Sequence, residues 1–234
     1  MKQKYLSANA LKIIACVAMA IDHMGYMIFP SQKIFRIIGR ISYPIFAYFL
    51  AKGCYYTKNR LKRFLTLLIF AVVCQTGFYL FTKETKMSIL VTFCISELLI
   101  YFLCYFKESL ASDKVLTCYL STFFFGLGII FTILFCFKVH VDYGFWGCIA
   151  PVLTAIPMKK QKTIGIAETL FLCLGIYLLQ FSNTLGYINY FSYLAIPFLL
   201  VYNGERGKYN IKYFFYFFYP LHLCVLQGIA YLIR

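Results

Sequence analysis

Acidic residues, histidines and long polar segments are scarce in this chain. Only 13% of its 234 residues are charged, with eight Asp and Glu and three His, whereas 62% are hydrophobic. Soluble domains are about 45–50% apolar and about 25% charged, so this composition excludes the soluble classes of protein. Together with a mean hydropathy of +0.76, the scarcity of charge predicts an integral membrane protein.

The sequence also lacks the features of a divided, disulfide-linked or metal-binding protein. No Pro-, Gly- or Ser-rich linker interrupts it, so we expect a single integral membrane domain over residues 1–234. The ten Cys stand singly, without a CxxC pair, and nearly all lie in apolar segments. Free Cys acts there as a small hydrophobe, so the pattern predicts neither a disulfide framework nor a metal site.

Long apolar segments fill most of the chain instead. About 20 residues at about 1.5 Å each span roughly 30 Å, the thickness of a bilayer core. We therefore predict an all-α, polytopic transmembrane helix bundle of about nine spans, within a range of eight to ten because the sixth and eighth segments are short and contain proline. The nine segments are Ala10–Phe29, Ile34–Tyr56, Leu61–Thr82, Met87–Phe106, Val115–Phe137, Val141–Pro157, Thr163–Phe181, Ile188–Tyr202 and Ile211–Ile233.

Basic residues outnumber acidic residues strongly. The 23 Lys and Arg give a formal net charge of +15, which would suit nucleic-acid binding. These residues lie in short loops between the apolar segments, however, as the positive-inside rule requires of a membrane protein. We therefore expect membrane lipids and no nucleic acid around the protein. Lys and Arg are more numerous in the loops that share a side with the N-terminus, so we expect the N-terminus in the cytoplasm.

An Asp-His pair, Asp22-His23, lies inside the first apolar segment. A charged Asp near the middle of a membrane helix costs about 2.5–3.5 kcal/mol, so we expect the pair to be used. With Phe29 at the outer edge, Asp22 lies about 10 Å deep, and Arg40 on the next span lies about 9 Å deep. We expect Asp22 to pair with Arg40 or, as the alternative, with its i,i+4 neighbour Arg36. Consecutive helical residues point about 100° apart, so His23 is expected to face a cavity instead.

Further ionisable residues fall within apolar segments. His222 follows Tyr219-Pro220-Leu221 in the last segment, where proline removes a backbone donor and favours a kink. We expect His222 either to line a polar pocket or to be a hydrogen-bonded core histidine. Glu97 and Glu168, in the fourth and seventh segments, favour a structural role.

A group of basic residues lies at the cytoplasmic ends of the first and third segments. Lys12 opens the first segment, and Lys58, Arg60, Lys62 and Arg63 precede or begin the third. Such a group can anchor the protein at the cytoplasmic surface. It can also bind a cofactor that carries phosphates, and the sequence leaves both roles open.

Asp22-His23, Arg36-x-x-Gly39-Arg40 and Tyr219-Pro220-Leu221-His222 together form a combination of polar residues that resembles the TraX family. Asp-His, Arg-x-x-Gly-Arg and Tyr-Pro-Leu-His stand on separate spans, and the resemblance is strong over residues 11–63 and about 213–224. The positions that carry it are Leu11, Lys12, Ile14, Ala15, Asp22, His23, Phe35, Arg36, Gly39, Arg40, Pro44, Phe46, Tyr48, Gly53, Tyr56, Thr57, Asn59 and Phe218–Leu223.

The resemblance implies acyl transfer at a bacterial membrane. The founding member of the TraX family acts on conjugative pilin and is credited with acetylating its N-terminus. TraX proteins also resemble polytopic acyltransferases that take an acyl group from acyl-CoA inside the cell and acylate an acceptor outside. The resemblance thus implies a multi-pass protein of the cytoplasmic (inner) membrane. Its co-substrate would be acetyl-CoA, and its acceptor an amine or hydroxyl of an extracytoplasmic pilin-like peptide or envelope glycan.

For that chemistry the candidate residues divide by role. Acyl transfer needs a general base and a group that stabilises the oxyanion. His23 is the expected base because histidine titrates near neutral pH, and His222 is the second candidate or an oxyanion donor. Asp22 would orient the site through Arg40, with Arg36 and Arg40 stabilising negative charge on the substrate. The basic group of Lys12, Lys58, Arg60, Lys62 and Arg63 would bind the CoA phosphates.

Two other functions fit the same sequence. Intramembrane Asp, Glu and His also occur in proton relays, so a small-solute or proton-coupled transporter is one alternative. No internal repeat is visible in the chain, which disfavours an inverted-repeat transporter. The other alternative is a non-catalytic assembly factor for a secreted peptide or pilus.

Overall fold

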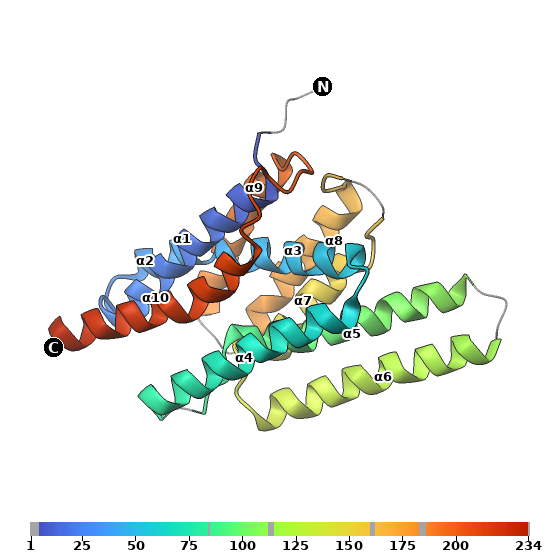
Figure 1. Ribbon diagram of the computed structural model, residues 1–234, viewed down its shortest axis with the longest axis horizontal. Coiled ribbons are helices and arrows are strands. Elements are labelled where there is room, and N and C mark those ends of the chain that lie inside the picture. The colour runs from blue at the N-terminus through green and yellow to red at the C-terminus, as the bar shows by residue number, and fades with distance from the viewer. Residues whose placement is uncertain (1–4, 84, 112–114, 160–161, 183–185, 234) are drawn as a thin grey trace.

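Helices make up almost all of the structure. The computed structural model describes residues 5–83, 85–111, 115–159, 162–182 and 186–233 (Figure 1). Within these ranges two isolated β-bridges occur and no strand. The helices are α1 (Ala8–Met27), α2 (Lys33–Gly39), α3 (Ser42–Tyr56), α4 (Arg60–Thr82), α5 (Ile89–Leu110), α6 (Val115–Lys138), α7 (Gly144–Ala155), α8 (Ile166–Leu178), η1 (Leu179–Phe181), η2 (Gly186–Leu194), α9 (Ala195–Leu200) and α10 (Lys212–Ile233).

Six helical stretches in the described part of the chain are long and apolar enough to cross a membrane. They are α1, the α2–α3 pair, α4, α5, α6 and α10, and two shorter apolar stretches, Gly144–Ala155 and Ile166–Phe181, accompany them. The predicted segment 188–202 is not one α-helix, because it forms the 3-10 helix η2 and the short α9. The all-helical class is confirmed, whereas the nine-span count and the cytoplasmic N-terminus stay predictions.

The second predicted span is interrupted between α2 and α3. The N–H of Arg40 bonds to the carbonyl of Ile37, three residues back, instead of to that of Arg36. Pro44 explains the interruption, because it has no N–H to donate to the Arg40 carbonyl and its ring crowds that carbonyl. The carbonyl of Arg36 is then left for a side chain, and it accepts Nε of Arg40 at 3.1 Å.

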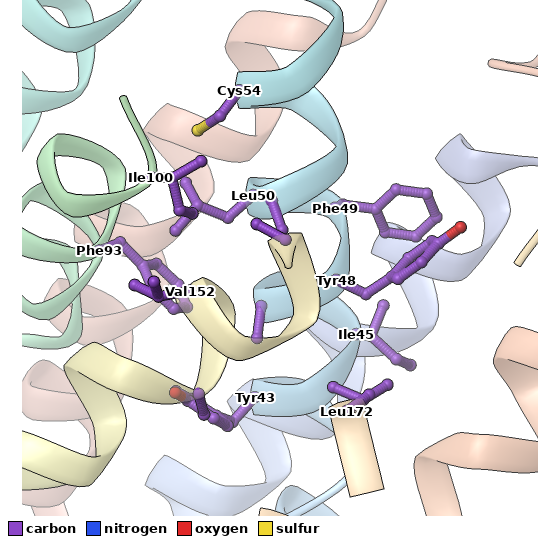
Figure 2. Packing of buried hydrophobic residues seen from close by; sticks show 14 of the residues in the cluster. Tyr43, Ile45, Tyr48, Phe49, Leu50, Cys54, Phe93, Ile100, Val152 and Leu172 are labelled. Atoms are coloured by element: carbon purple, nitrogen blue, oxygen red, sulfur yellow. The ribbon is translucent and has the colours of Figure 1, made fainter. Parts of the chain in front are cut away.

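The central packing surrounds α3. From Ser42 to Ala51 every residue of this helix except Phe46 is buried. Figure 2 shows its side chains among Phe93 and Ile100 of α5 and Val152 of α7. Because α3 starts two residues after Arg40, the buried core holds that arginine in a fixed position.

The periphery is apolar as well. α6 packs on α5 at the outside of the bundle (Figure 1), and its large side chains, such as Leu116 and Phe137, are exposed. Only Ser121 and Thr132 are buried in this helix. An apolar face of this length is suited to lipid, which agrees with a membrane protein.

Glycines let α1 and α2 approach closely beside Asp22. A Cβ added at Gly39 would overlap the side chain of Asp22, and one added at Gly25 would overlap Phe35. Interiors packed this densely have no room for an extra methyl group. The absence of these two side chains therefore brings α2 within reach of the Asp22 carboxylate.

Gly39→Ala is expected to destabilise the protein by about 1–3 kcal/mol, the usual cost of overpacking, because its methyl group displaces Asp22. Gly126→Ala on α6 is the matched control, since nothing lies within 4 Å of a Cβ there and Ala favours helix over Gly. Thermal unfolding in detergent measures both changes. An unchanged midpoint for Gly39→Ala would contradict the close approach of the two helices.

Candidate functional site

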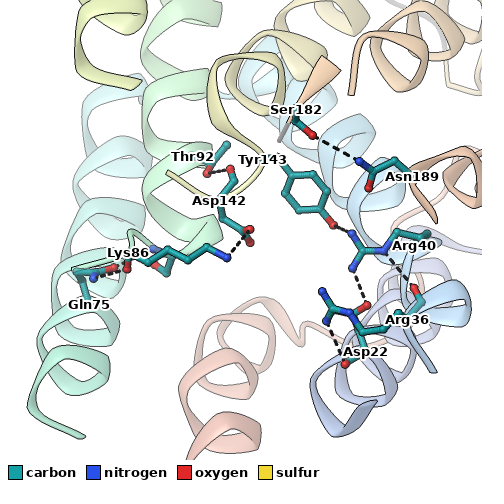
Figure 3. Close-up of polar contacts among 11 residues, drawn as sticks. Asp22, Arg36, Arg40, Gln75, Lys86, Thr92, Asp142, Tyr143, Ser182 and Asn189 are labelled. Carbon is teal, nitrogen blue, oxygen red and sulfur yellow. Dashed lines mark hydrogen bonds and ion pairs between the residues drawn. The ribbon is translucent and has the colours of Figure 1, made fainter. Parts of the chain in front are cut away.

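Asp22 of α1 binds two arginines at once (Figure 3). Nη1 of Arg36 donates to Oδ2 of Asp22 at 2.5 Å, and Nη2 of Arg40 donates to Oδ1 at 2.6 Å. Asp22 is 8% exposed and Arg40 is 3% exposed, and charges this deeply buried need such partners. The predicted pair with Arg40 is confirmed, and the alternative partner Arg36 occupies the second oxygen of the same carboxylate.

The two arginines differ in their remaining donors. Arg40 donates from Nη1 to the hydroxyl of Tyr143 at 2.6 Å and from Nε to the carbonyl of Arg36, so all three of its nitrogens are engaged. Nη1 of Arg36 also donates to the backbone carbonyl of Asp22, at the peptide bond that leads to His23. Within the described residues, Nε and Nη2 of Arg36 donate to no protein group. Arg40 is therefore the clamp, and Arg36 has donors left for a ligand.

His23 meets His222, which comes from the far end of the sequence. Nε2 of His222 lies 3.0 Å from Nδ1 of His23, and Nδ1 of His222 lies 2.8 Å from the carbonyl oxygen of Phe218. A carbonyl only accepts, so we assign the proton of neutral His222 to Nδ1. Its Nε2 is then an acceptor, which makes Nδ1 of His23 the donor. This tautomer leaves the lone pair of His23 on Nε2.

Aromatic rings enclose the histidine pair. Phe218 stacks on His222 with ring centroids 4.9 Å apart, and Tyr219 meets His23 edge-on at 6.4 Å. Both aromatic residues belong to α10 and stand directly before Pro220. These rings pack against the pair from α10, while His23 itself is half-buried.

One cavity of about 1170 Å³ connects this site with a distant group of basic residues. Its histidine end is lined by His23, Asp22, Arg36 and Arg40, whereas His222 lies behind His23 and is not part of the lining. Its basic end lies near the start of α1. The basic end is lined by Lys12, Lys52, Arg63, Lys162 and Arg206, and aromatic residues such as Phe49, Phe93 and Tyr216 line the wall between the two ends.

The basic end contains part of the basic group expected from the sequence. Lys12 lines it, with Nζ 5.1 Å from the ring centroid of Phe49 and 5.4 Å from that of Phe215. Arg63 lines it as well, whereas Lys58, Arg60 and Lys62 do not. Arg60 forms an exposed ion pair with Glu108. Binding of a cofactor by these three outer residues stays a prediction.

Sequence reasoning missed several residues at the histidine end. Tyr143 binds Arg40 and stacks on Tyr43 at 4.5 Å, and Lys86 pairs with Asp142 at 3.6 Å on the cavity wall. Loop residues such as these carry no periodic pattern that would have placed them here. No group of three His, Cys, Asp or Glu suited to a metal ion occurs in the part of the chain that the structure describes.

Comparison with known proteins places the chain in a family. Two relatives are each 26% identical to it. One is named probable fimbrial assembly protein FimC, serogroup H1, of Dichelobacter nodosus, and the alignment covers 94% of both chains. The other is an uncharacterized protein of Rickettsia prowazekii (strain Madrid E), and its alignment covers 94% of this chain and 91% of the relative. No solved structure matches the chain. The family model described as TraX protein matches residues 7–230, and the chain therefore belongs to the TraX family.

Proposed function

We propose that the protein is a membrane-embedded acyltransferase that moves an acetyl group from acetyl-CoA to an amine or hydroxyl of an extracytoplasmic acceptor. The observation that carries the proposal is the continuous cavity that joins the basic end to His23. A donor that carries phosphates at one end and a thioester at the other needs this distribution of charge and base. The protein would lie in the bacterial cytoplasmic membrane with its basic end facing the cytoplasm.

His23 is the proposed general base. Nε2 of His23 takes the proton from the acceptor O–H or N–H as the acceptor atom attacks the thioester carbonyl. The imidazolium that forms donates from Nδ1 to Nε2 of His222, and the Phe218 carbonyl holds the ring of His222 in that orientation. When the carbon–sulfur bond breaks, His23 returns the proton to the thiolate of CoA. His222 thus positions His23 and need not touch the substrate.

Arg36 is the proposed partner of the oxyanion. Its guanidinium is fixed by the Asp22 carboxylate and by the Asp22 carbonyl beside His23, and it has two further nitrogens to donate from. A donor held in place before the reaction stabilises developing charge without reorganisation. Arg40, whose nitrogens are all engaged, keeps Asp22 and Arg36 in place.

The distance between the two ends suits a CoA donor. Lys12 and His23 lie on one helix, roughly three turns and about 16 Å apart. This is the scale of an extended pantetheine arm, so phosphates at the basic end are compatible with a thioester at His23. Lys12, Lys52 and Arg206 at the basic end would bind the phosphates.

The name of one relative supports the choice of acceptor in this proposal. The Dichelobacter relative is named a fimbrial assembly protein, which favours a pilin-like peptide over an envelope glycan. The same name also fits a non-catalytic assembly factor. Restoration of pilus assembly in a deletion strain by the Asp22→Ala, His23→Ala double variant would favour that second function over acyl transfer.

Residues near both ends of α1, from Ala8 to Met27, line the cavity. A cavity that runs along the helix in this way also suits the passage of a small solute. A proton-coupled transporter would take up solute into proteoliposomes that contain no acyl-CoA. Acyl transfer predicts no such uptake and requires the thioester.

His23→Ala is expected to lower acetyl transfer by about 100-fold or more, the contribution of a general base. His222→Ala is expected to lower it less, because His222 acts through His23. The measurement is transfer of label from acetyl-CoA by purified protein to peptide amines and to hydroxyl acceptors. His140→Ala is the matched control, since His140 is exposed and outside the cavity. Full activity of His23→Ala would exclude His23 as the base.

Lys12→Ala and Arg206→Ala are each expected to raise KM for acetyl-CoA about tenfold with little change in kcat, the effect of losing one charge-assisted contact. Acetyl-pantetheine has the same arm without the nucleotide phosphates, and its KM should not change. Lys58→Ala is the control, because Lys58 does not line the cavity. A rise in KM for Lys58→Ala alone would place the cofactor on the outer surface near α4.

A further inference from the structure

Arg63 reaches from α4 across the cavity wall to α3 and α5. Its Nε donates to Oε1 of Glu97 at 3.1 Å, and its Nη2 donates to the carbonyl of Leu50 at 3.3 Å. A Cβ at Gly53 would overlap Nη1 of Arg63, so the missing side chain of Gly53 makes the space in which the guanidinium lies. Within the described residues, Nη1 donates no hydrogen bond to a protein group.

Glu97 is equally incomplete in its hydrogen bonding. Oε1 accepts from Arg63 and from the hydroxyl of Tyr101 at 2.5 Å. Oε2 is buried and has no hydrogen-bond partner in the described structure, although the residue is 0% exposed. A buried acceptor that is left unsatisfied costs about 1–3 kcal/mol, and more when it is charged. An oxygen of this kind on a cavity wall is suited to a donor from a ligand.

The position of Glu97 lies between the two ends of the cavity. Leu90, Phe93 and Glu97 follow one another at helical spacing on α5, and all three line the cavity. Glu97 is therefore the polar residue at which the apolar face of α5 meets the basic end. A ligand that extends from the basic end toward His23 shares the cavity that Glu97 lines.

We propose that Glu97 and Arg63 form a subsite for an amide group in the arm of the acyl donor. An amide presents an N–H donor beside a carbonyl acceptor, which complements a carboxylate oxygen beside a guanidinium N–H. Oε2 of Glu97 accepts from the amide N–H, and Nη1 of Arg63 donates to the amide carbonyl. The inference rests on the proposed function, because a pantetheine arm is what brings two amides into this part of the cavity.

Glu97→Gln tests the subsite, because it retains the shape of the side chain. If the NH2 group replaces Oε2, the accepting oxygen is lost. If it replaces Oε1, the bond to Arg63 is lost. The donors are acetyl-pantetheine, which has the amides but no nucleotide phosphates, and S-acetyl-2-mercaptoethanol, which has no amide. The kcat/KM for acetyl-pantetheine is expected to fall about tenfold, the scale of one hydrogen bond to a charged group. The kcat/KM for the amide-free thioester should stay at the native value. Equal losses with both donors, or no loss with either, would overturn the proposal.

Two further variants separate a binding role from a folding defect. Glu168→Gln changes a buried carboxylate in the first turn of α8 that does not line the cavity. This variant should leave the ratio of kcat/KM for the two donors unchanged. Arg63→Lys keeps the charge and removes the planar fork, so it should repeat the selective loss with acetyl-pantetheine. If Glu97→Gln does not fold, Arg63→Lys decides the question by the same comparison of donors.

Binding of unacylated pantetheine separates the subsite from the proposed reaction. Weaker binding of pantetheine by Glu97→Gln than by native protein supports the subsite even where no donor supports transfer, and in that case the proposed acyl transfer alone has failed. Acetyl transfer by native protein combined with unchanged pantetheine binding by Glu97→Gln overturns the subsite and leaves the acyltransferase proposal standing.

Discussion

The double ion pair of Asp22 with Arg36 and Arg40 is the contact on which the candidate site depends. It joins α1 to α2 through both carboxylate oxygens and reaches the start of α7 through the hydroxyl of Tyr143. Asp22 and Arg40 are buried and Arg36 is half-buried. Each of these charges would be costly alone in an apolar bundle, and the ion pairs offset that cost. Because Asp22 is fixed toward α2, the next residue, His23, faces α10 and the cavity.

The double ion pair and the buried core around α3 place His23 at one end of the cavity, and the basic end lies opposite. α3 is buried along most of its length and starts two residues after Arg40, so packing and ion pairing fix the same segment. His222 supports His23 from behind without lining the cavity. This separation gives the reacting face to His23 and Arg36 and leaves Arg40 and His222 to position them. The proposed acyl transfer uses that division directly.

Much of this arrangement could be predicted from local pattern in the sequence. Apolar runs gave helix positions close to those of α1, α4, α5, α6 and α10, because the length and composition of a membrane helix are set by the bilayer. The pairing of Asp22 with Arg40 followed from equal depth on consecutive antiparallel spans. Contacts between distant segments could not be predicted in the same way. His23 and His222 are 199 positions apart. No periodicity relates Lys52 or Arg206 to Lys12, since a lysine or arginine looks the same in the sequence whether it anchors the protein or lines a cavity.

A structure of the protein with S-acetonyl-CoA, an unreactive thioether analogue of acetyl-CoA, tests the central claim most directly. The account predicts the phosphates at Lys12 and Arg206, the arm along the cavity, and the acetonyl carbonyl beside His23 and Arg36. Density for the analogue outside the cavity, or inside it with the acetonyl group at the basic end, would contradict the account.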